Sequence, residues 1–243
     1  MERRAENKTM TGRITRRATL GMAGTMALGG TAALSGENAT GGPVRIVGIA
    51  CSPRKGKTTA TGVSAALDAA RGVDPDIQTE LIDLGGLNIA GSLGGATSAE
   101  AKQPEDDFEL EVLPVLKAPR LPDGLIIGSP CYFRTMSALC KAFLERLQVF
   151  RSPKLMLADR PLGVLCVGAY RNGGQELVIQ EIQTAMLCHE VMPVGGKPRA
   201  HQGATLWNAY KDDIMKDEFG IDTAQKLGIR VAEAALKLRR AKG

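Results

Sequence analysis

The sequence predicts a three-layer α/β fold in which a five-stranded parallel sheet carries helices on both faces. Apolar runs of strand length alternate with segments of helical periodicity from residue 44 onward. The first run, residues 44–50, is apolar at almost every position, as in a strand that is buried on both faces. Long helical segments separate successive strands, which is the spacing of βαβ units and therefore of parallel strands.

Each expected element follows from its own local pattern. Apolar residues at helical spacing mark the helices, and short apolar or alternating runs mark the strands. Pro193 lacks an N–H donor and places the last strand at an edge of the sheet. Residues 85–105, rich in Gly, Ala and Ser, and the segment through Trp207 are predicted as loops. The predicted strands are residues 44–50, 77–84, 124–128, 162–167 and 191–194, and the predicted helices are residues 59–71, 108–116, 136–150, 175–188 and 222–240.

The net charge of +5 on 243 residues comes mostly from the N-terminal segment. Residues 1–36 hold six Lys or Arg residues and two Glu residues, so the rest of the chain is close to neutral. A nearly neutral body excludes the broad basic surface that nucleic-acid-binding proteins carry. We therefore expect no nucleic acid among the partners of this protein.

The N-terminal segment has the pattern of a targeting sequence. Arg16 and Arg17 precede a Gly- and Ala-rich apolar stretch, residues 20–34, which is too short and too rich in glycine for a stable membrane span. The pattern resembles a twin-arginine export signal. Residues 1–40 are therefore predicted to be an export signal and linker, and residues 41–243 the single folded domain. The expected location is the periplasm or cell envelope, with only transient membrane contact, and the alternative is a cytoplasmic protein with a basic tail.

The loop after the first strand has the residues of a phosphate site. Ser52, Thr58 and Thr59 offer hydroxyl groups where the backbone N–H groups of a helix start are free to bind an anion. Arg54 adds a planar cation. A nucleotide-binding P-loop is an alternative, but Cys51 replaces its first glycine and no later strand clearly ends in the Asp that holds magnesium. A second alternative is a helix start that Thr58 caps without any ligand.

Two further loops leave the carboxyl ends of strands, where parallel sheets bind their ligands. Residues 128–136 contain Tyr132 and Phe133, and a flat heteroaromatic ring would remove this aromatic pair from water. The alternative is that the pair packs against the chain itself or against a partner subunit. Residues 168–176 contain two adjacent glycines, which let the backbone approach a ligand closely.

The three loops together resemble the NAD(P)H-dependent FMN reductase and iron–sulfur flavoprotein group of flavodoxin-like proteins. The resemblance covers residues 44–236, and the segments that carry it are residues 51–59, 128–133, 136–139 and 172–176. It implies a flavodoxin-like sheet with the strand order 2-1-3-4-5 and bound FMN.

The resemblance also implies which residues contact FMN. The phosphate lies at the first loop, and the isoalloxazine ring lies between the other two. The implied contacts are Ser52, Arg54, Thr58 and Thr59 with the phosphate, Pro130, Cys131, Tyr132, Phe133 and Met136 with the ring, and Ala169, Tyr170, Gly173 and Gly174 with its other edge. No side chain is required as a general acid or base, because the flavin carries the hydride and electron chemistry.

The cysteines separate this chain from the iron–sulfur members of the group, which carry a cysteine cluster after the second strand. Residues 87–95 contain no cysteine, and the five cysteines of the chain lack metal-ligand spacing, so neither an iron–sulfur centre nor another metal site is expected. Cys51 and Cys131 follow the first and third strands, which are neighbours in the flavodoxin-like order. We hypothesise a disulfide between them in an oxidising compartment.

The expected function is an FMN-dependent oxidoreductase that takes reducing equivalents from NAD(P)H or another donor. The expected acceptor is a quinone, a flavin, a metal ion or another small oxidant. The alternatives are an exported electron carrier without turnover of its own and, less favoured, a P-loop nucleotide hydrolase. Members of the group commonly form dimers or tetramers, so a homodimer or homotetramer is expected.

Overall fold

The computed structural model describes residues 42–93, 103 and 105–241. The predicted export signal and linker, residues 1–40, lie outside these residues. Within the part of the chain that is described, no helix has the combined length and apolar character that a membrane-spanning segment needs.

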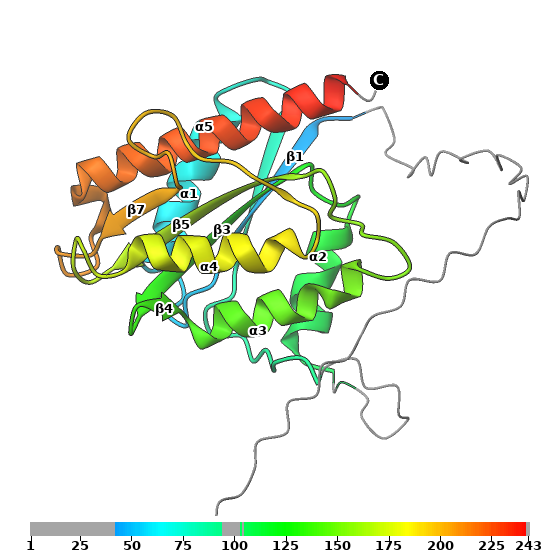
Figure 1. Cartoon of the computed structure of the whole chain (residues 1–243), viewed down its shortest axis with the longest axis horizontal. Coiled ribbons are helices and arrows are strands. Elements are labelled where there is room, and N and C mark those ends of the chain that lie inside the picture. Colours follow the sequence, from blue (N-terminus) through cyan, green and yellow to red (C-terminus); the bar gives the residue numbers. More distant parts are fainter. Residues whose placement is uncertain (1–41, 94–102, 104, 242–243) are drawn as a thin grey trace, which may run out of the picture. The chain divides into compact units, whose positions relative to one another are not determined.

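A parallel sheet forms the middle layer of the domain (Figure 1). Its main strands, in the spatial order β2-β1-β3-β5, are β2 (Ile77–Asp83), β1 (Val44–Ala50), β3 (Gly124–Tyr132) and β5 (Pro161–Gly168). All three pairings between these strands are parallel. β1 and β5 are buried at every position because helices cover both faces of the sheet. The predicted flavodoxin-like fold is therefore confirmed.

Two short strands share the fifth position of the sheet. β6 (Met192–Pro193) pairs with the start of β5, and β7 (Ala204–Trp207) pairs with its end. The strand predicted over residues 191–194 is reduced to two residues, and Pro193 has no N–H group to continue the ladder. The loop predicted through Trp207 is wrong, since this segment forms β7 with alternating buried and half-buried positions. Four residues are too few for this alternation to stand out in the sequence.

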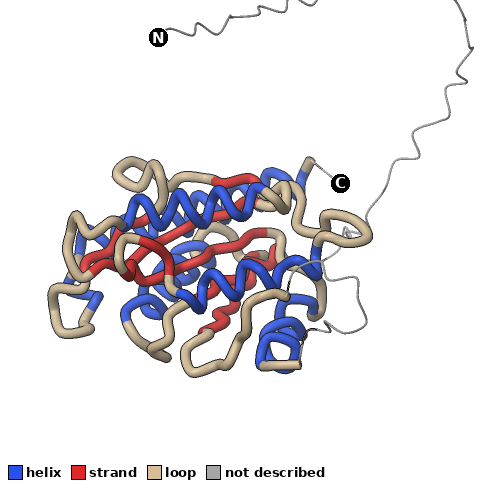
Figure 2. The backbone as a smooth tube through the Cα atoms, turned by 60° about the horizontal axis from the view of Figure 1, so that its bottom comes forward, coloured by secondary structure: helices blue, strands red, loops and turns tan. Residues whose placement is uncertain are grey.

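Helices cover the two faces of the sheet as separate layers (Figures 1 and 2). One face carries α1 (Thr58–Arg71) and α5 (Glu218–Arg240), whose apolar side chains share one buried cluster with the sheet. The other face carries a π-helical turn (Phe108–Val112), α2 (Leu113–Lys117), α3 (Ala138–Arg146) with a following 3-10 turn (Leu147–Phe150), and α4 (Gln175–Leu187). A second 3-10 turn, Ile214–Lys216, precedes α5.

Two helix starts lie two or more residues from the predicted position. The helix expected over residues 136–150 begins at Ala138, because the two residues before Ser137 form a strand. α5 begins at Glu218, four positions before the expected start, and Asp217 at its N-terminus is buried.

α1 and α5 contact each other through their backbones. A Cβ atom on Gly228 of α5 would lie 1.9 Å from the Ala66 carbonyl oxygen of α1, so a larger residue does not fit. This close packing fixes α1 against the sheet, and with it the loop that leads into α1.

Candidate functional site

β1 runs into a tight loop, residues 51–57, at the carboxyl edge of the sheet. The Arg54 N–H donates to Ser52 Oγ at 3.2 Å, and the Gly56 N–H donates to Asp83 Oδ2 at 2.7 Å. Gly56 has a φ of +66°, a conformation that glycine adopts without strain. Since Asp83 ends β2, the neighbouring strand fixes the loop that leaves β1.

The start of α1 is not capped by any side chain. Lys57 at the N-cap makes no side-chain hydrogen bond to the helix, and the first turn has no acidic residue. Thr58 and Thr59 are buried, and Thr59 Oγ1 is one of two buried side-chain polar atoms without a hydrogen-bond partner among the described residues. Leaving such a group unpaired costs about 1–3 kcal/mol. A phosphate would supply the missing acceptor and the negative charge that a helix start favours, so these residues fit an anionic ligand.

Arg54, which the sequence predicts to bind the phosphate, is paired with a carboxylate. Its Nη1 donates to both oxygens of Asp212 at 2.9 Å. Asn208 Nδ2 also donates to Asp212 at 2.9 Å, and the bonds from Asn208 and from Arg54 lower the pKa of this carboxyl. Asp212 lies 158 positions from Arg54 in the chain, so sequence reasoning missed the pair. Phosphate binding by Arg54 stays a prediction, and it requires Arg54 to leave Asp212 for the phosphate.

The second loop is a hairpin. β3 continues beyond the predicted residue 128 to Tyr132, and β4 (Thr135–Met136) pairs with it in the antiparallel direction. Phe133 and Arg134 form the turn with φ values of +50° and +67°. This left-handed conformation costs about 1–2 kcal/mol for a residue with a Cβ atom, and such strain is concentrated at functional sites. The turn has none of the Asn or Gly residues that mark a hairpin in a sequence.

The hairpin is fixed to α4 and leaves its aromatic tip in solvent. Thr135 Oγ1 donates to Glu181 Oε2 at 2.8 Å, and the Met136 N–H donates to the same oxygen at 3.1 Å. Tyr132 is 40% exposed and Phe133 is fully exposed. A ligand or a second protein surface at this position would therefore bury a large apolar area.

A glutamine and a tryptophan hold the third loop in place. Gln175 Nε2 donates to the Tyr170 carbonyl at 2.6 Å, while Gln175 Oε1 accepts the Gly173 N–H at 2.8 Å. Trp207 Nε1 donates to the Ala169 carbonyl at 3.0 Å. The Tyr170 side chain is left exposed above this fixed backbone.

The three loops meet at one edge of the sheet. The Cys131 thiol donates to the Gly173 carbonyl at 3.2 Å, which joins the hairpin to the third loop. Ser137 Oγ donates to the Cys51 carbonyl at 2.6 Å, which joins the hairpin to the first loop. The predicted site residues lie on these loops or at their ends: Ser52, Thr58, Thr59 and Pro130 are buried, Cys131, Met136, Gly173 and Gly174 are half-buried, and Arg54, Tyr132, Phe133, Ala169 and Tyr170 are exposed.

Sequence reasoning missed a cluster that borders these loops. The Arg171 guanidinium carbon lies 4.7 Å from the centre of the Trp207 ring, and Arg171 Nη2 lies 2.7 Å from Asp217 Oδ1. Asp217 is buried and also accepts the Trp207 N–H at 2.7 Å. Arg171 and Arg134 both line a cavity of about 540 Å³ beside the hairpin. The one sign of this cluster in the sequence is the single tryptophan, Trp207, which lies in a segment predicted as a loop.

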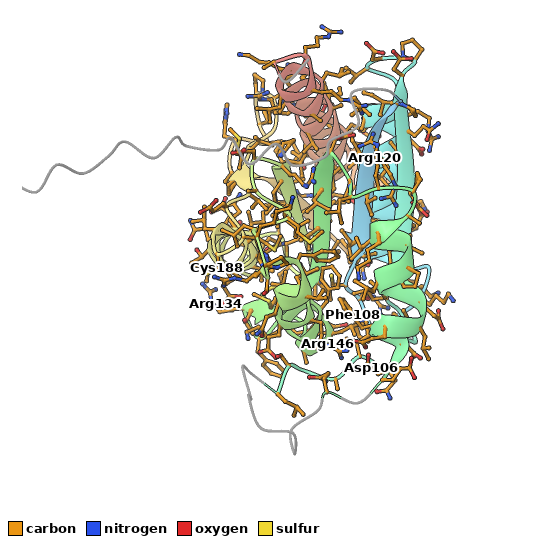
Figure 3. All side chains as sticks on the ribbon, turned by 90° about the vertical axis from the view of Figure 1, so that its right-hand side faces the viewer. Asp106, Phe108, Arg120, Arg134, Arg146 and Cys188 are labelled. Carbon is orange, nitrogen blue, oxygen red and sulfur yellow. The ribbon has the colours of Figure 1, made fainter. Side chains whose placement is uncertain are left out.

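A buried arginine fixes the segment that follows β2. Arg146 Nη1 donates to Asp106 Oδ2 at 2.5 Å and to the Ala90 carbonyl at 3.2 Å, and Arg146 also pairs with Glu109. Its guanidinium carbon lies 4.9 Å from the centre of the Phe108 ring, and Figure 3 shows Asp106, Phe108 and Arg146 together. Burial acts to raise the pKa of Asp106, but the bonds from Arg146 and from two backbone N–H groups outweigh it and lower that pKa.

The hypothesised disulfide between Cys51 and Cys131 is wrong, because all five cysteines are free and these two face other partners. Cys51 is fully buried, and its thiol hydrogen-bonds to Cys140 of α3. Cys131 hydrogen-bonds to Cys166 of β5 instead. Within the described ranges, no group of three or more His, Cys, Asp or Glu residues has an arrangement that could hold a metal ion.

Comparison with known proteins assigns this architecture to a family. A model of the NADPH-dependent FMN reductase family matches residues 44–204. The chain belongs to this family. An iron–sulfur flavoprotein of Methanocaldococcus jannaschii is 35% identical over 199 residues, which cover 81% of this chain and 100% of the relative. An iron–sulfur flavoprotein of Methanosarcina thermophila is 29% identical over 186 residues, which cover 76% of this chain and 93% of the relative.

Solved structures of flavin proteins share the fold. RosB with bound 8-demethyl-8-formylriboflavin-5'-phosphate aligns with a TM-score of 0.66 at 14% identity, over 82% of each chain. An NADH:FMN oxidoreductase (EMOB) in its apo form aligns with a TM-score of 0.52 at 21% identity, over 80% of this chain and 89% of that one. At these identities the similarity shows the fold alone. Family membership identifies the chain as an FMN-dependent oxidoreductase.

Proposed function

We propose that this protein binds FMN at the three loops and passes reducing equivalents from NAD(P)H or another donor to a quinone, a flavin or another small acceptor. The observation that carries the placement is the buried, unpartnered Thr59 hydroxyl at the uncapped start of α1. The phosphate of FMN has the charge and the acceptor oxygens that this helix start lacks. Bound FMN supplies the hydride and electron transfer.

The chain's own contribution is to hold the ring and to keep water from it. Tyr132, Phe133 and Tyr170 present exposed aromatic side chains at the edge where the ring is expected. Burying one such side chain contributes about 1.5–3 kcal/mol. Gln175 and Glu181 fix the loops that carry these residues, so the surface is formed before a ligand arrives.

The visible spectrum of the purified full-length protein tests the proposal. We expect flavin absorption bands, release of the pigment on denaturation, and chromatographic identification of the pigment as FMN. Steady oxidation of NAD(P)H with an added quinone supports the enzyme, whereas bound FMN that reacts with neither nicotinamide supports an electron carrier. A colourless protein that cannot be reconstituted with FMN, yet binds ATP with magnesium in calorimetry, contradicts the proposal.

We also propose that residues 1–40 direct export by the twin-arginine route. The support is the pair Arg16 and Arg17 in front of a glycine-rich apolar stretch. Replacing both arginines by lysine keeps the charge, and we expect the protein to accumulate in the cytoplasm instead of the cell envelope. Cell fractionation with immunodetection measures the distribution, and an unchanged distribution contradicts export by this route.

A homodimer or homotetramer is the assembly that we propose. The support is the fully exposed Phe133 at the hairpin tip, since a second copy would remove this side chain from water. Light scattering coupled to size-exclusion chromatography gives the mass in solution. A mass equal to the 25.7 kDa of one chain contradicts the proposed assembly.

A further inference from the structure

Two cysteines beside the expected flavin ring form a pair whose members differ in exposure. Cys131, at the end of β3, is half-buried, whereas Cys166 of β5 is fully buried. Their thiols hydrogen-bond to each other. Cys166 is the register partner of Ser129, so Cys131 lies two positions further along β3 on the same face of the sheet.

We propose that Cys131 and Cys166 form a redox-active dithiol that reduces small hydroperoxides and is regenerated by electrons from the flavin. The proposal rests on the proposed FMN site, because the hairpin that carries Cys131 is the expected wall of that site. The half-buried thiol is the one that a peroxide can reach, and the buried thiol is the one that resolves the product.

The surroundings of Cys131 favour the reactive thiolate form. The pKa of Cys131 is lowered to about 7, first by the hydrogen bond from Cys166 and then by the backbone N–H and the charge of Arg134. Burial and the carboxylate of Glu181 act in the opposite direction but are outweighed. A thiolate is the nucleophile in reactions with peroxides, and thiolates that are accessible and close to a second thiol are typical of redox-active cysteines.

The chain contains a matched pair that we expect to be inert. Cys51 and Cys140 also hydrogen-bond to each other, but both are fully buried. Burial is the main cause that raises the pKa of Cys51 well above its ordinary value. A peroxide reacts fastest with a thiol that is exposed and ionised. It will therefore oxidise Cys131 and leave the Cys51–Cys140 pair of the same molecule unchanged.

The proposed cycle balances in three steps. The Cys131 thiolate attacks one oxygen of the hydroperoxide, the O–O bond breaks, and the leaving alkoxide or hydroxide takes a proton, which leaves Cys131 as a sulfenic acid. The Cys166 sulfur then attacks the Cys131 sulfur, the S–O bond breaks, and water leaves with the Cys166 proton. Two electrons and one proton, which bound reduced flavin would supply, break the disulfide and return Cys131 to the thiolate and Cys166 to the thiol.

Closing this disulfide requires a local movement. A disulfide joins Cα atoms about 4.4–6.8 Å apart, and diagonal neighbours on adjacent strands lie further apart than direct neighbours. The end of β3 therefore moves toward β5. The two-residue strand β4 carries few ladder bonds, so the hairpin is the part expected to shift, once the bonds from Thr135 and Met136 to Glu181 open.

Thiol mapping tests the pair directly. Thiol-reduced, FMN-loaded full-length protein receives one equivalent of hydrogen peroxide and is then unfolded in the presence of N-ethylmaleimide, which alkylates every thiol that is still free. Peptide mass spectrometry should show a linked Cys131–Cys166 peptide, with Cys51, Cys140 and Cys188 still alkylated. The rate of Cys131 alkylation should rise with pH around a midpoint near 7, and Cys166→Ala should move that midpoint upward.

Anaerobic titration with dithionite counts the stored electrons. After peroxide treatment the wild type should take up about four electrons per flavin, two for the flavin and two for the disulfide. Cys166→Ala should take up about two. The control is Cys188→Ser, which removes the exposed thiol after α4 and should match the wild type.

Two results overturn the proposal. One is a wild type that binds FMN, keeps all its thiols free after peroxide and takes up about two electrons per flavin. The other is oxidation of Cys131 to the sulfinic acid without any linked peptide, which removes the role of Cys166. The thiol map can also be made on protein without FMN, so a colourless protein contradicts the proposed function while its map still decides the chemistry of the pair.

Discussion

α1 and α3 both begin at the carboxyl edge of the sheet, yet their first turns differ. At α3, Ser137 accepts the Cys140 N–H at 3.0 Å and donates to the Cys51 carbonyl at 2.6 Å. At α1, Lys57 offers no side-chain bond and the Thr59 hydroxyl has no partner in the described structure. A helix start whose polar groups are already paired has no need of an anion, whereas a helix start with unpaired polar groups is stabilised by binding one. The contrast therefore separates the structural helix from the ligand-binding one.

The largest expected effect comes from the other end of α3, where Arg146 pairs with Asp106 and Glu109 in a buried setting. Arg146→Met should lower the free energy of unfolding by about 3–5 kcal/mol, because it leaves the buried Asp106 carboxylate and the half-buried Glu109 carboxylate without this partner. Urea denaturation of the FMN-free protein measures this. Arg71→Met is the control, since the Arg71–Asp68 pair is exposed and such pairs contribute about 0–1 kcal/mol.

The same pair gives an expected pH dependence. The pKa of Asp106 is lowered in the folded protein, so its stabilising contribution is present above the ordinary carboxyl pKa near 3.9. It is lost as the pH falls through the lowered value. Arg146→Met should therefore reduce the loss of stability that occurs as the pH falls below the ordinary carboxyl pKa, and an identical acid profile in both proteins would contradict this expectation.

Next in size is the effect of Thr59→Val, which removes the unpartnered hydroxyl and keeps the shape of the side chain. FMN should bind about 10- to 150-fold more weakly, since a hydrogen bond to a charged group contributes about 1.5–3 kcal/mol. The stability of the FMN-free protein should stay unchanged or rise. Thr61→Val, two residues further along α1, is the matched control, because Thr61 Oγ1 already donates to the Lys57 carbonyl. Flavin fluorescence titration gives both dissociation constants.

Ser137→Ala should have the opposite profile. Loss of the cap should lower the free energy of unfolding by about 0.5–2 kcal/mol, while the FMN dissociation constant changes little. Thermal unfolding and the same fluorescence titration measure the two quantities. If Ser137→Ala weakened FMN binding as much as Thr59→Val, the distinction between the two helix starts would be wrong.

The smallest effect is expected at the hairpin tip. Arg134→Gly should raise the free energy of unfolding by up to about 1 kcal/mol, because glycine adopts a positive φ without the penalty of a Cβ atom. The same change at Arg151, where φ is −93°, should lower it. A lower free energy of unfolding in Arg134→Gly would show that the arginine side chain stabilises the fold by more than the backbone strain destabilises it.

The sequence predicts the long elements of this fold well and the short ones poorly. β1 and β5 are continuous apolar runs, so pattern alone locates them. β4 and β7 have two and four residues, too few for a periodic signal, and their partners come from the tertiary fold. This is why the hairpin and the true end of the sheet appear only in the structure.

The candidate site divides in the same way. The three loops could be predicted because each directly follows a recognisable strand at the edge where ligands bind. The bonds that fix them could not, because Arg54 and Asp212, or Trp207 and Ala169, are far apart in the chain. No local spacing relates such partners, so only their folded positions reveal them.

Trp207 gives the molecule a built-in optical probe. It is the only tryptophan in 243 residues, and its indole contacts the third loop twice, through the Ala169 carbonyl and the Arg171 guanidinium. Its emission will respond when a yellow chromophore occupies the neighbouring loops, so filling and emptying can be followed in real time without attaching a dye.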